Sequence, residues 1–312
     1  MSTRNRVAIV IGASRGIGAF IAQRLSTDGY TVVVAARRLG NSTQATNVDF
    51  CAPTCTLQNV ADEIKRRGGV ASAVECDVAD PTAIERLFEQ ALKTWGRVDA
   101  VVFNAGAIWW GPVKDTDYKR YSLLTTVNQN ALYKTVQVAL PLFTKQKHGR
   151  ILVVSPPIYS RFFRGKTAYA MSKVAMTVLT HGLAMELEEF NSKNGLLDSQ
   201  GLAITSLWPA TAVQSAVTHV KQINPEFLRK PTIFADAVLG ILNEPSSKVN
   251  GGAFIDEDYL REHKGITDFS HYQVVPGKEP ARMMPRKFPS LLVEEQDDRG
   301  FAVAEGKSKP KL

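Results

Sequence analysis

Residues 7–18 read VAIVIGASRGIG, an apolar run that leads directly into a turn with glycines at positions 12, 16 and 18. Such a run predicts a buried strand, and glycines directly after it predict a tight turn into a helix. A turn of this kind brings the backbone close to a pyrophosphate, which the helix N-terminus binds through its free N–H groups and positive potential. Three glycines alone are a weak signal, so a tight turn that binds no ligand is the alternative interpretation.

Six further apolar runs follow along the chain. They lie at residues 31–36, 71–75, 100–103, 150–154, 203–207 and 252–255. Most are separated by stretches of helical periodicity, for example AIERLFEQALKTW at residues 83–95. Because the runs are apolar throughout rather than alternating, we expect helices to cover both faces of the strands. The sequence therefore predicts an α/β fold with one Rossmann-type, doubly wound domain of about seven parallel strands flanked by helices.

The chain is expected to divide into a domain, an extension and a tail. The domain should span residues 1–256, with a polar insertion at residues 38–57 after the second strand. Residues 257–293 are charged and contain several prolines, which predicts a C-terminal extension that packs on the domain or on a neighbouring subunit. For residues 294–312 we expect a flexible tail.

Composition and charge limit the classes of function. The chain has 312 residues, 44% of them hydrophobic, which is enough for a substantial core. Its net charge is +8, but the cations alternate with acids, as in DEIKRRGG, so we expect no nucleic-acid partner and favour a phosphorylated cofactor as the acidic ligand. No apolar run approaches the roughly 18 to 20 residues needed to span a bilayer. We therefore expect a soluble protein without membrane insertion.

The three cysteines, Cys51, Cys55 and Cys76, form no recognisable disulfide framework. No signal peptide precedes the first apolar run, so reduced thiols in an intracellular protein are expected. Cys51 and Cys55 are a Cys-x3-Cys pair without a nearby histidine, which predicts two cysteines on a surface loop rather than a zinc site. We expect no bound metal.

Four motifs occur in an order that resembles the short-chain dehydrogenase/reductase superfamily. They are GASRGIG at 12–18, FNAG at 103–106, Asn128, and YAMSK at 169–173. The resemblance covers about residues 5–256 and implies a nicotinamide dinucleotide cofactor and hydride transfer. Two positions depart from the family pattern, because Ile11 replaces the usual threonine and Phe103 the usual asparagine.

A narrower resemblance extends to about residue 280. The segments VSPP (154–157), SLWPATAVQS (206–215), GGAFIDEDYL (251–260) and VVPGKEP (274–280) are similar to the hydroxysteroid dehydrogenase-like subgroup. That subgroup shares a Ser-Pro-Pro variant of the active-site serine region. The name of the subgroup is no evidence for a steroid substrate.

The choice of cofactor follows from the charges at the end of the second strand, VVVAARR. Ala36 stands where an acidic residue would bind the ribose 2′-hydroxyl of NAD. Arg37 and Arg38 follow, and Arg15 lies in the glycine turn. Guanidinium groups bind phosphate in bidentate geometry, so NADP(H) is predicted in preference to NAD(H). The alternative is that Arg37 and Arg38 only begin a solvated loop.

The resemblance implies further cofactor contacts at the ends of other strands. Asp77 and the backbone after it would meet the adenine, Ser215 would meet the pyrophosphate, and the backbone of Ala212 or Val213 would meet the carboxamide. The loop after the sixth strand has an alternative interpretation as an ordinary connection. The complete set of expected cofactor-binding residues is Gly12, Ser14, Arg15, Gly16, Ile17, Gly18, Arg37, Arg38, Asp77, Val78, Asn104, Ala105, Gly106, Tyr169, Lys173, Pro209, Ala212, Val213 and Ser215.

Tyr169 and Lys173 are the strongest candidates for proton transfer. Side chains at positions i and i+4 share one face of a helix, so the ammonium group can lower the pKa of the phenol from its ordinary value of about 10. Tyr169 would protonate the developing alkoxide during reduction and recover the proton during oxidation. The resemblance implies that Asn128 holds a water that links Lys173 to solvent. An incidental Tyr/Lys pair is the alternative.

The active-site serine of the family is displaced in this chain. Counting 13 residues back from Tyr169 gives Pro156, and the serine is its neighbour Ser155. Alternation along a strand directs Ser155 away from the face that position 156 uses, and a residue before proline is restricted to extended conformations. The Pro-Pro pair can still redirect the backbone, so Ser155 stays a candidate donor to the substrate oxygen.

Five aromatic residues, Trp109, Trp110, Tyr159, Phe162 and Phe163, lie in segments that border the active site in the resembling fold. They predict an apolar, fairly bulky substrate, or alternatively some belong to the core or to a subunit interface. We expect an NADP(H)-dependent oxidoreductase that acts on a carbonyl or alcohol group. The alternative is a dinucleotide-binding protein with weak or no redox activity, or one with a non-redox reaction, because Pro156 replaces the serine.

Assembly and location are weakly constrained. The resemblance implies a homodimer or homotetramer. The cytoplasm is the expected compartment, and the terminal Pro-Lys-Leu makes the peroxisome the alternative.

Overall fold

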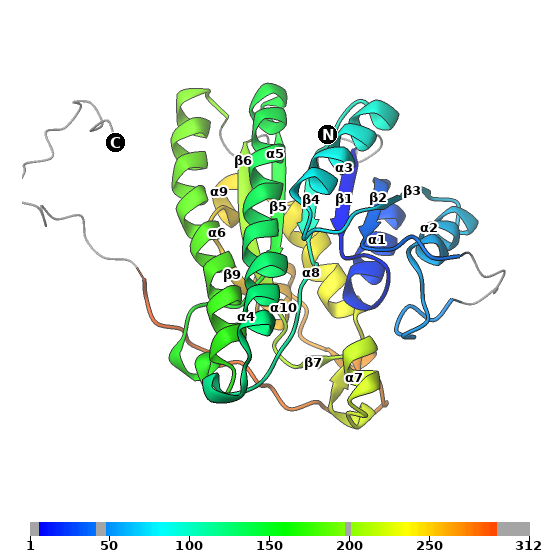
Figure 1. Cartoon of the computed structure of the whole chain (residues 1–312), viewed down its shortest axis with the longest axis vertical. Helices are drawn as coiled ribbons and strands as arrows, with labels where there is room; N and C mark the ends of the chain where they lie inside the picture. Colours follow the sequence, from blue (N-terminus) through cyan, green and yellow to red (C-terminus); the bar gives the residue numbers. More distant parts are fainter. Residues whose placement is uncertain (1–5, 42–47, 197–200, 292–312) are drawn as a thin grey trace, which may run out of the picture.

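A parallel sheet of seven strands forms the centre of the molecule (Figure 1). The computed structural model describes residues 6–41, 48–196 and 201–291. The strands of the sheet are β1 (Val7–Ile11), β2 (Thr31–Ala36), β3 (Val70–Glu75), β4 (Ala100–Phe103), β5 (Gly149–Val154), β6 (Leu202–Trp208) and β9 (Ala253–Ile255). They are arranged in the order β3-β2-β1-β4-β5-β6-β9. The predicted α/β, doubly wound class is confirmed, and each predicted strand lies within one residue of its expected bounds.

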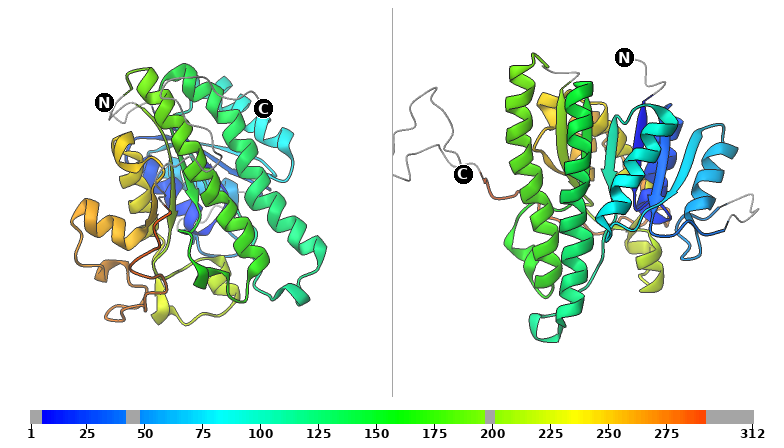
Figure 2. Two further views of the ribbon diagram at one scale, coloured as in Figure 1. Left: turned by 90° about the vertical axis from the view of Figure 1, so that its left-hand side faces the viewer. Right: turned by 45° about the horizontal axis from the view of Figure 1, so that its top comes forward.

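Helices cover both faces of this sheet, as the uniformly apolar strands require (Figures 1 and 2). The long helices are α1 (Gly16–Thr27), α2 (Leu57–Arg66), α3 (Pro81–Trp95), α5 (Ala131–Gln146), α6 (Thr167–Lys193) and α8 (Thr232–Leu242). Alternate residues of β1 belong to two different hydrophobic cores. Ala8 and Val10 pack with α1, α2 and α8 on one face of the sheet. Ile9 and Ile11 pack with α3, α5 and α6 on the other face. The two cores fix the sheet between two helical layers.

The order of the strands reverses between β1 and β4. β1 pairs with β2 on one side and with β4 on the other, and all three run parallel. Gly12 follows β1 and Asn104 follows β4, so both lie at the carboxyl edge of the sheet at this reversal. In open α/β sheets, ligands bind in the crevice at such a switch point.

Shorter elements surround the carboxyl edge of the sheet. They are η1 (Val113–Asp115), α4 (Tyr118–Leu124), the π-helical turn η2 (Thr125–Asn130), η3 (Ser160–Phe163), β7 (Ala212–Val213), α7 (Ala216–Val220), η4 (Pro225–Phe227), β8 (Leu228–Arg229), α9 (Ser246–Val249), α10 (Asp256–Lys264) and η5 (Ser270–Tyr272). The sequence did not predict the parallel pair β7 and β8, because two residues are too short to show a strand pattern.

The insertion after β2 packs back onto the glycine turn. The backbone N–H of Gly16 donates to the carbonyl of Phe50 at 2.6 Å, and the ring of Phe50 packs edge-on against Phe20. Cys51 and Cys55 are buried, so the prediction of two surface-loop cysteines is wrong; the neighbouring aromatic contact draws this loop into the core. Burial raises the pKa of Cys51 to about 12 and that of Cys55 to about 11, which keeps both thiols protonated.

The C-terminal extension packs on its own domain in this structure. The Tyr272 hydroxyl donates to Asp236 of α8 at 2.9 Å, and the Lys230 N–H donates to the carbonyl of Tyr272 at 2.7 Å. Residues 42–47 of the insertion and residues 294–312, for which a flexible tail is predicted, lie outside the described residues. Within the described ranges, no helix is long and apolar enough to cross a membrane and no group of three or more potential metal ligands occurs.

Candidate active site

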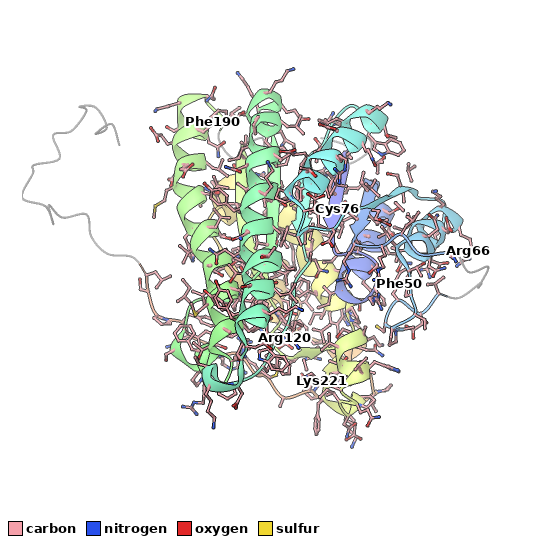
Figure 3. All side chains as sticks on the ribbon, in the orientation of Figure 1. Phe50, Arg66, Cys76, Arg120, Phe190 and Lys221 are labelled. Atoms are coloured by element: carbon pink, nitrogen blue, oxygen red, sulfur yellow. The ribbon has the colours of Figure 1, made fainter. Side chains whose placement is uncertain are left out.

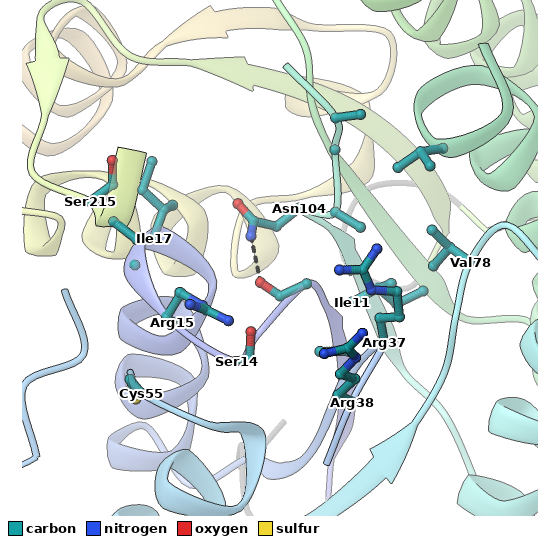
Figure 4. Close-up of a pocket in the computed structure, with 18 of the residues that line it drawn as sticks. Ile11, Ser14, Arg15, Ile17, Arg37, Arg38, Cys55, Val78, Asn104 and Ser215 are labelled. Atoms are coloured by element: carbon teal, nitrogen blue, oxygen red, sulfur yellow. Dashed lines mark hydrogen bonds between the residues drawn. The ribbon is translucent and has the colours of Figure 1, made fainter. Parts of the chain in front are cut away.

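A cavity of about 730 Å³ opens at the switch point of the sheet (Figure 4). Its size lies within the range of small-molecule sites. The glycine turn, the ends of three strands, the insertion and the start of α7 form its walls. Among the predicted cofactor residues, those that line it are Gly12, Ser14, Arg15, Gly16, Ile17, Arg37, Arg38, Asp77, Val78, Asn104, Ala105, Gly106 and Ser215. Gly18, Tyr169, Lys173, Pro209, Ala212 and Val213 lie outside this lining.

The glycine turn leaves no room for side chains. Gly12 has a positive φ of 87°, and a Cβ there would lie 2.6 Å from the backbone N of Ala105. A Cβ on Gly18 would lie 2.2 Å from the carbonyl O of Gly12. The Asn104 amide donates to that same carbonyl at 2.8 Å, as Figure 4 shows. The turn therefore needs glycine both for its backbone conformation and for the close packing of α1.

The insertion contributes walls that the sequence did not predict. The residues of the insertion that line the cavity beside the glycine turn are Gly40, Pro53, Thr54, Cys55 and Thr56. The Arg15 guanidinium donates to the carbonyl of Pro53, and the Gly16 N–H donates to the carbonyl of Phe50. One hydrogen bond of the Arg15 guanidinium is therefore made within the protein. One feature of the sequence could have indicated that the insertion lines the cavity. The insertion follows β2 directly, and the end of that strand was expected to border the cofactor.

Arg37 and Arg38 supply the positive charge of the cavity. Both side chains are exposed, and Figure 4 shows them beside Ile11 on the same wall. Neither guanidinium has a hydrogen bond or ion pair with any part of the chain that the structure describes. Together with the bare glycine turn, they fit a phosphorylated dinucleotide.

Tyr169 and Lys173 lie one turn apart near the start of α6 and are both buried, with 5% and 4% exposure. The Lys173 Nζ donates to the carbonyl of Val154 at 2.8 Å. Burial lowers the pKa of Lys173 to about 7 and raises that of Tyr169 above its ordinary value. The sequence led us to expect that Lys173 lowers the pKa of the Tyr169 phenol. In the structure this pKa is raised instead, because desolvation dominates when both groups are buried.

Asn128 connects this pair to the cavity. It is fully buried in the π-helical turn η2, and its side chain accepts from the Ala107 N–H at 2.7 Å and donates to the Ala107 carbonyl at 3.1 Å and to the Ser172 hydroxyl at 2.9 Å. A Cβ on Gly106, which lines the cavity, would lie 3.3 Å from Asn128 Oδ1 and 3.4 Å from Lys173 Nζ. Asn128 therefore holds the backbone that separates Lys173 from the cavity. Its role in binding a water stays a prediction.

Ser155 directs its hydroxyl into the interface between β5 and α6. Its side chain is fully buried, and Thr177 Oγ1 donates to Ser155 Oγ at 2.9 Å and to the Pro156 carbonyl at 2.7 Å. Thr177 is eight residues beyond Tyr169, about 12 Å along the helix axis. This geometry agrees with the direction expected from strand alternation and supports the interpretation that neither position 155 nor 156 offers a hydroxyl beside Tyr169.

An aromatic cluster surrounds Tyr169. The ring of Phe162 lies 6.2 Å from that of Tyr169 and 5.8 Å from that of Trp208. Tyr159 lies 6.0 Å from Phe162, and Trp109 packs against the same cluster. The sequence did not identify Trp208 as part of the site, because its position depends on packing between distant segments.

The remaining predicted aromatics face outward. Trp110 is 53% exposed and Phe163 is 38% exposed. Lys221 lies over the ring of Trp110 at 4.1 Å, and Arg120 lies over that of Trp109 at 4.3 Å. Figure 3 shows both cations at the same end of the molecule, beyond the carboxyl edge of the sheet. Trp110 and Phe163 are therefore placed at the rim rather than beside Tyr169.

The loop after β6 is held at Ala210. Its N–H donates to the buried Asp256 carboxylate at 2.8 Å, and its carbonyl accepts from the N–H groups of Met283 and Met284 at 2.8 and 3.1 Å. Burial raises the pKa of Asp256 to about 7. Farther along, the Ser215 side chain caps α7 by accepting from the Thr218 N–H. The loop thus has a defined path along the cavity, with Ser215 on its wall.

Comparison with known proteins places these features in a family. The family described as short chain dehydrogenase matches residues 6–193. Hydroxysteroid dehydrogenase-like protein 2 of Mus musculus is 32% identical over 296 residues, which cover 92% of this chain. The chain spans only 56% of the length of that relative.

Solved structures give the same result. A short chain dehydrogenase from Mycobacterium thermoresistibile superposes with a TM-score of 0.78 at 30% identity, covering 96% of this chain and 99% of the other. A metagenomic short-chain oxidoreductase in complex with NADP superposes with a TM-score of 0.62 at 26% identity, covering 82% and 98%. Both share the fold, and the second contains a bound dinucleotide.

Proposed function

Because the chain belongs to the short-chain dehydrogenase family, we propose that it is an NADP(H)-dependent oxidoreductase acting on the carbonyl or alcohol group of a fairly bulky, apolar or aromatic substrate. One observation carries this proposal. Tyr169 and Lys173 are buried on one helix beside an aromatic cluster, and a Cβ on Gly106, which lines the cavity, would lie 3.4 Å from Lys173 Nζ. This closeness of a candidate proton donor, an aromatic cluster and the cavity supports the proposal.

The residues of this chain would divide the reaction between them. When bound, the reduced nicotinamide supplies a hydride to the carbonyl carbon. Tyr169 gives its hydroxyl proton to the carbonyl oxygen, and the same group takes the proton back when the alcohol is oxidised. The raised pKa of Tyr169 keeps it protonated before reduction. The protonated form of Lys173 then favours the phenolate that Tyr169 leaves after donating.

The preference for NADP(H) rests on the arginines of the cavity. Arg37 and Arg38 are exposed at its wall, without partners in the described ranges, and no acidic side chain occupies position 36. A 2′-phosphate would give both guanidinium groups a bidentate acceptor. The NADP-bound relative is consistent with this choice.

A second function has an observation in its favour. The Ser155 hydroxyl is bonded to Thr177, and Pro156 has no hydroxyl to offer. Loss of one donor to a developing oxyanion typically costs about 10²- to 10³-fold in rate. The chain could accordingly bind the dinucleotide with weak or no redox activity, or have acquired a non-redox reaction.

One experiment tests both functions. NADPH and NADH are titrated by fluorescence, and NADPH consumption is then followed with a panel of aromatic and aliphatic ketones for wild type and Pro156→Ser. Turnover by wild type supports the oxidoreductase. Tight binding of NADPH without turnover of any ketone by wild type, but with turnover by Pro156→Ser, supports the second function.

We also propose a homodimer or homotetramer built on the outer face of α5 and α6. These helices lie side by side (Figure 1), and Tyr133, Met171, Val178 and Met185 on them are all more than half exposed. Burial of such side chains is a typical driving force for association. Light scattering of wild type and Val178→Arg tests this assembly, which fails if wild type is monomeric.

The cytoplasm is the compartment we propose, with the peroxisome as the alternative through the terminal Pro-Lys-Leu. A reporter fused to the last ten residues should stay diffuse. Accumulation of that reporter in peroxisomes would establish the alternative.

A further inference from the structure

The C-terminal segment, residues 279–288, crosses the end of the molecule where the active site lies. Figure 1 draws it in orange to red, below the carboxyl ends of the strands, and Figure 2 shows the same crossing from two further directions. Its route takes it past the loop after β6 and on to the aromatic cluster. The segment is far from Tyr169 in sequence but close to its surroundings in space.

Two ionic anchors fix the segment. The buried Arg229 donates to Glu257 at 2.7 Å and also binds Glu279, the first residue of the segment. Arg282 binds both carboxylate oxygens of Asp258, at 2.7 and 2.5 Å. Bidentate pairs with one partner buried or half-buried define geometry more strictly than exposed pairs do. The path of residues 279–282 is therefore determined by Arg229 of β8, which binds Glu279, and by Asp258 of α10, which binds Arg282.

Beyond these anchors, the segment reaches the site itself. The N–H groups of Met283 and Met284 both donate to the carbonyl of Ala210, in the loop after β6. The hydroxyl of Tyr159 donates to the thioether of Met284 at 3.1 Å. The ring of Phe288 packs edge-on against that of Tyr159, with centroids 5.5 Å apart. A thioether and an aromatic ring thus both contact Tyr159.

Tyr159 joins this wall to the catalytic pair. Its ring lies 6.0 Å from that of Phe162, and the ring of Phe162 lies 6.2 Å from that of Tyr169. Met284 and Phe288 therefore lie just beyond the rings that surround Tyr169.

We propose that Met284 and Phe288, together with Tyr159, form the outer wall of the substrate site and set the size of the apolar group that the substrate carries away from its carbonyl. This inference rests on the proposed oxidoreductase function. The wall offers thioether and aromatic surfaces, which favour an aryl or extended alkyl group. The two residues act as specificity determinants, whereas Tyr169 performs the proton transfer.

The test compares two ketones with the same reacting group. Acetophenone and 4-phenylacetophenone differ only in the ring remote from the carbonyl. In Phe288→Ala, the ratio of kcat/KM for the larger over the smaller ketone should rise about tenfold, because discrimination by one apolar contact is of this order. Met284→Ala should raise the same ratio. Leu291→Ala is the control, because Leu291 lies three residues beyond the segment and is 52% exposed; it should leave the ratio unchanged.

A second readout separates this wall from the proposed function. Binding of benzyl alcohol and 4-phenylbenzyl alcohol, which NADPH cannot reduce, is followed by tryptophan fluorescence. Absence of any ketone reduction by wild type would defeat the oxidoreductase proposal, yet a relative gain of about tenfold for the larger alcohol in Phe288→Ala would still establish the wall. Equal ratios in wild type, Phe288→Ala and Met284→Ala, or no binding of either alcohol, would overturn it.

Discussion

The proposed cofactor side and the proposed substrate side of this site are built in different ways. On the cofactor side, the backbone of the glycine turn forms the wall, and the exposed Arg37 and Arg38 supply charge. On the substrate side, aromatic rings pack around Tyr169, which is only 5% exposed. The first region is an open groove, for which we propose a charged ligand, and the second is a packed aromatic cluster, for which we propose proton transfer. Changes on one side should therefore alter cofactor binding, and changes on the other should alter turnover.

The largest effect is expected from Tyr169→Phe. This change removes the proton donor but keeps the ring that packs against Phe162. We expect kcat for ketone reduction to fall about 10²- to 10⁴-fold, the usual contribution of acid–base catalysis. The Kd for NADPH should stay within about twofold, since the tyrosine lies outside the lining of the cavity. Steady-state kinetics and a fluorescence titration measure the two quantities.

Tyr118→Phe is the matched control, because Tyr118 is 80% exposed and loses the same hydroxyl. Its kcat should equal that of wild type. A Tyr169→Phe enzyme with undiminished kcat would remove the distinction between the two sides, since the apolar pocket would then supply no proton.

The next effect concerns the backbone of the groove. In Gly18→Ala, the new Cβ would lie 2.2 Å from the carbonyl O of Gly12 and 2.6 Å from the Asn104 amide, so the turn must shift. Overpacking of this kind costs about 1–3 kcal/mol. We expect a lower free energy of unfolding and a Kd for NADPH raised by about tenfold or more. Denaturant titration and fluorescence titration measure these changes.

Gly182→Ala provides the comparison for this prediction. Gly182 lies within α6, and a Cβ there would meet nothing within 4 Å. Alanine at a free helical position stabilises by about 0.5–1 kcal/mol. If Gly18→Ala binds NADPH as tightly as Gly182→Ala does, the close approach of α1 to the glycine turn does not govern the groove.

A smaller effect is expected from the arginines of the groove. In Arg37→Ala and in Arg38→Ala, the affinity for NADPH should fall about fivefold, equivalent to about 1 kcal/mol, because both side chains are exposed and solvent screens them. The affinity for NADH should not change. Arg164→Ala, which removes an exposed arginine outside the cavity lining, should leave both affinities as they are. Equal losses for NADPH and NADH would show that these arginines do not discriminate the 2′-phosphate.

The same contrast explains how much the sequence could predict. The glycine turn and the Tyr169/Lys173 pair are local patterns, so their spacing alone indicated both the strand-to-helix turn and the shared helix face. The strands were found because helices cover both faces of the sheet, which makes their apolar runs continuous. The fold could therefore be predicted almost completely.

The substrate side could be predicted only in part. Tyr159 and Phe162 were expected near the site, but Met284 contacts Tyr159 from 125 residues away, and no local pattern reports such a contact. The insertion shows the same limit, because its polar composition indicated a surface loop although Phe50 is buried against the glycine turn. Long-range packing, rather than local propensity, determines both regions.

The last prediction concerns pH and stability. The pKa of Lys173 is lowered by burial from 10.5 to about 7, so between these values the unfolded chain binds a proton that the folded chain does not. Stability must then rise with pH across this window, by at most about 1.4 kcal/mol per pH unit. Lys173→Met removes this contribution and leaves the other titrating groups, including Asp256, in place.

Urea denaturation of wild type and Lys173→Met at pH 7, 8 and 9, without cofactor, measures the difference. As the pH rises, the free energy of unfolding of wild type should increase relative to that of Lys173→Met. Arg37→Ala should show no such divergence, because Arg37 is exposed and its replacement leaves the buried Lys173 in place. Parallel curves for wild type and Lys173→Met would mean that Lys173 keeps its proton in the folded chain, and that the substrate side tolerates a buried charge as readily as the open groove does.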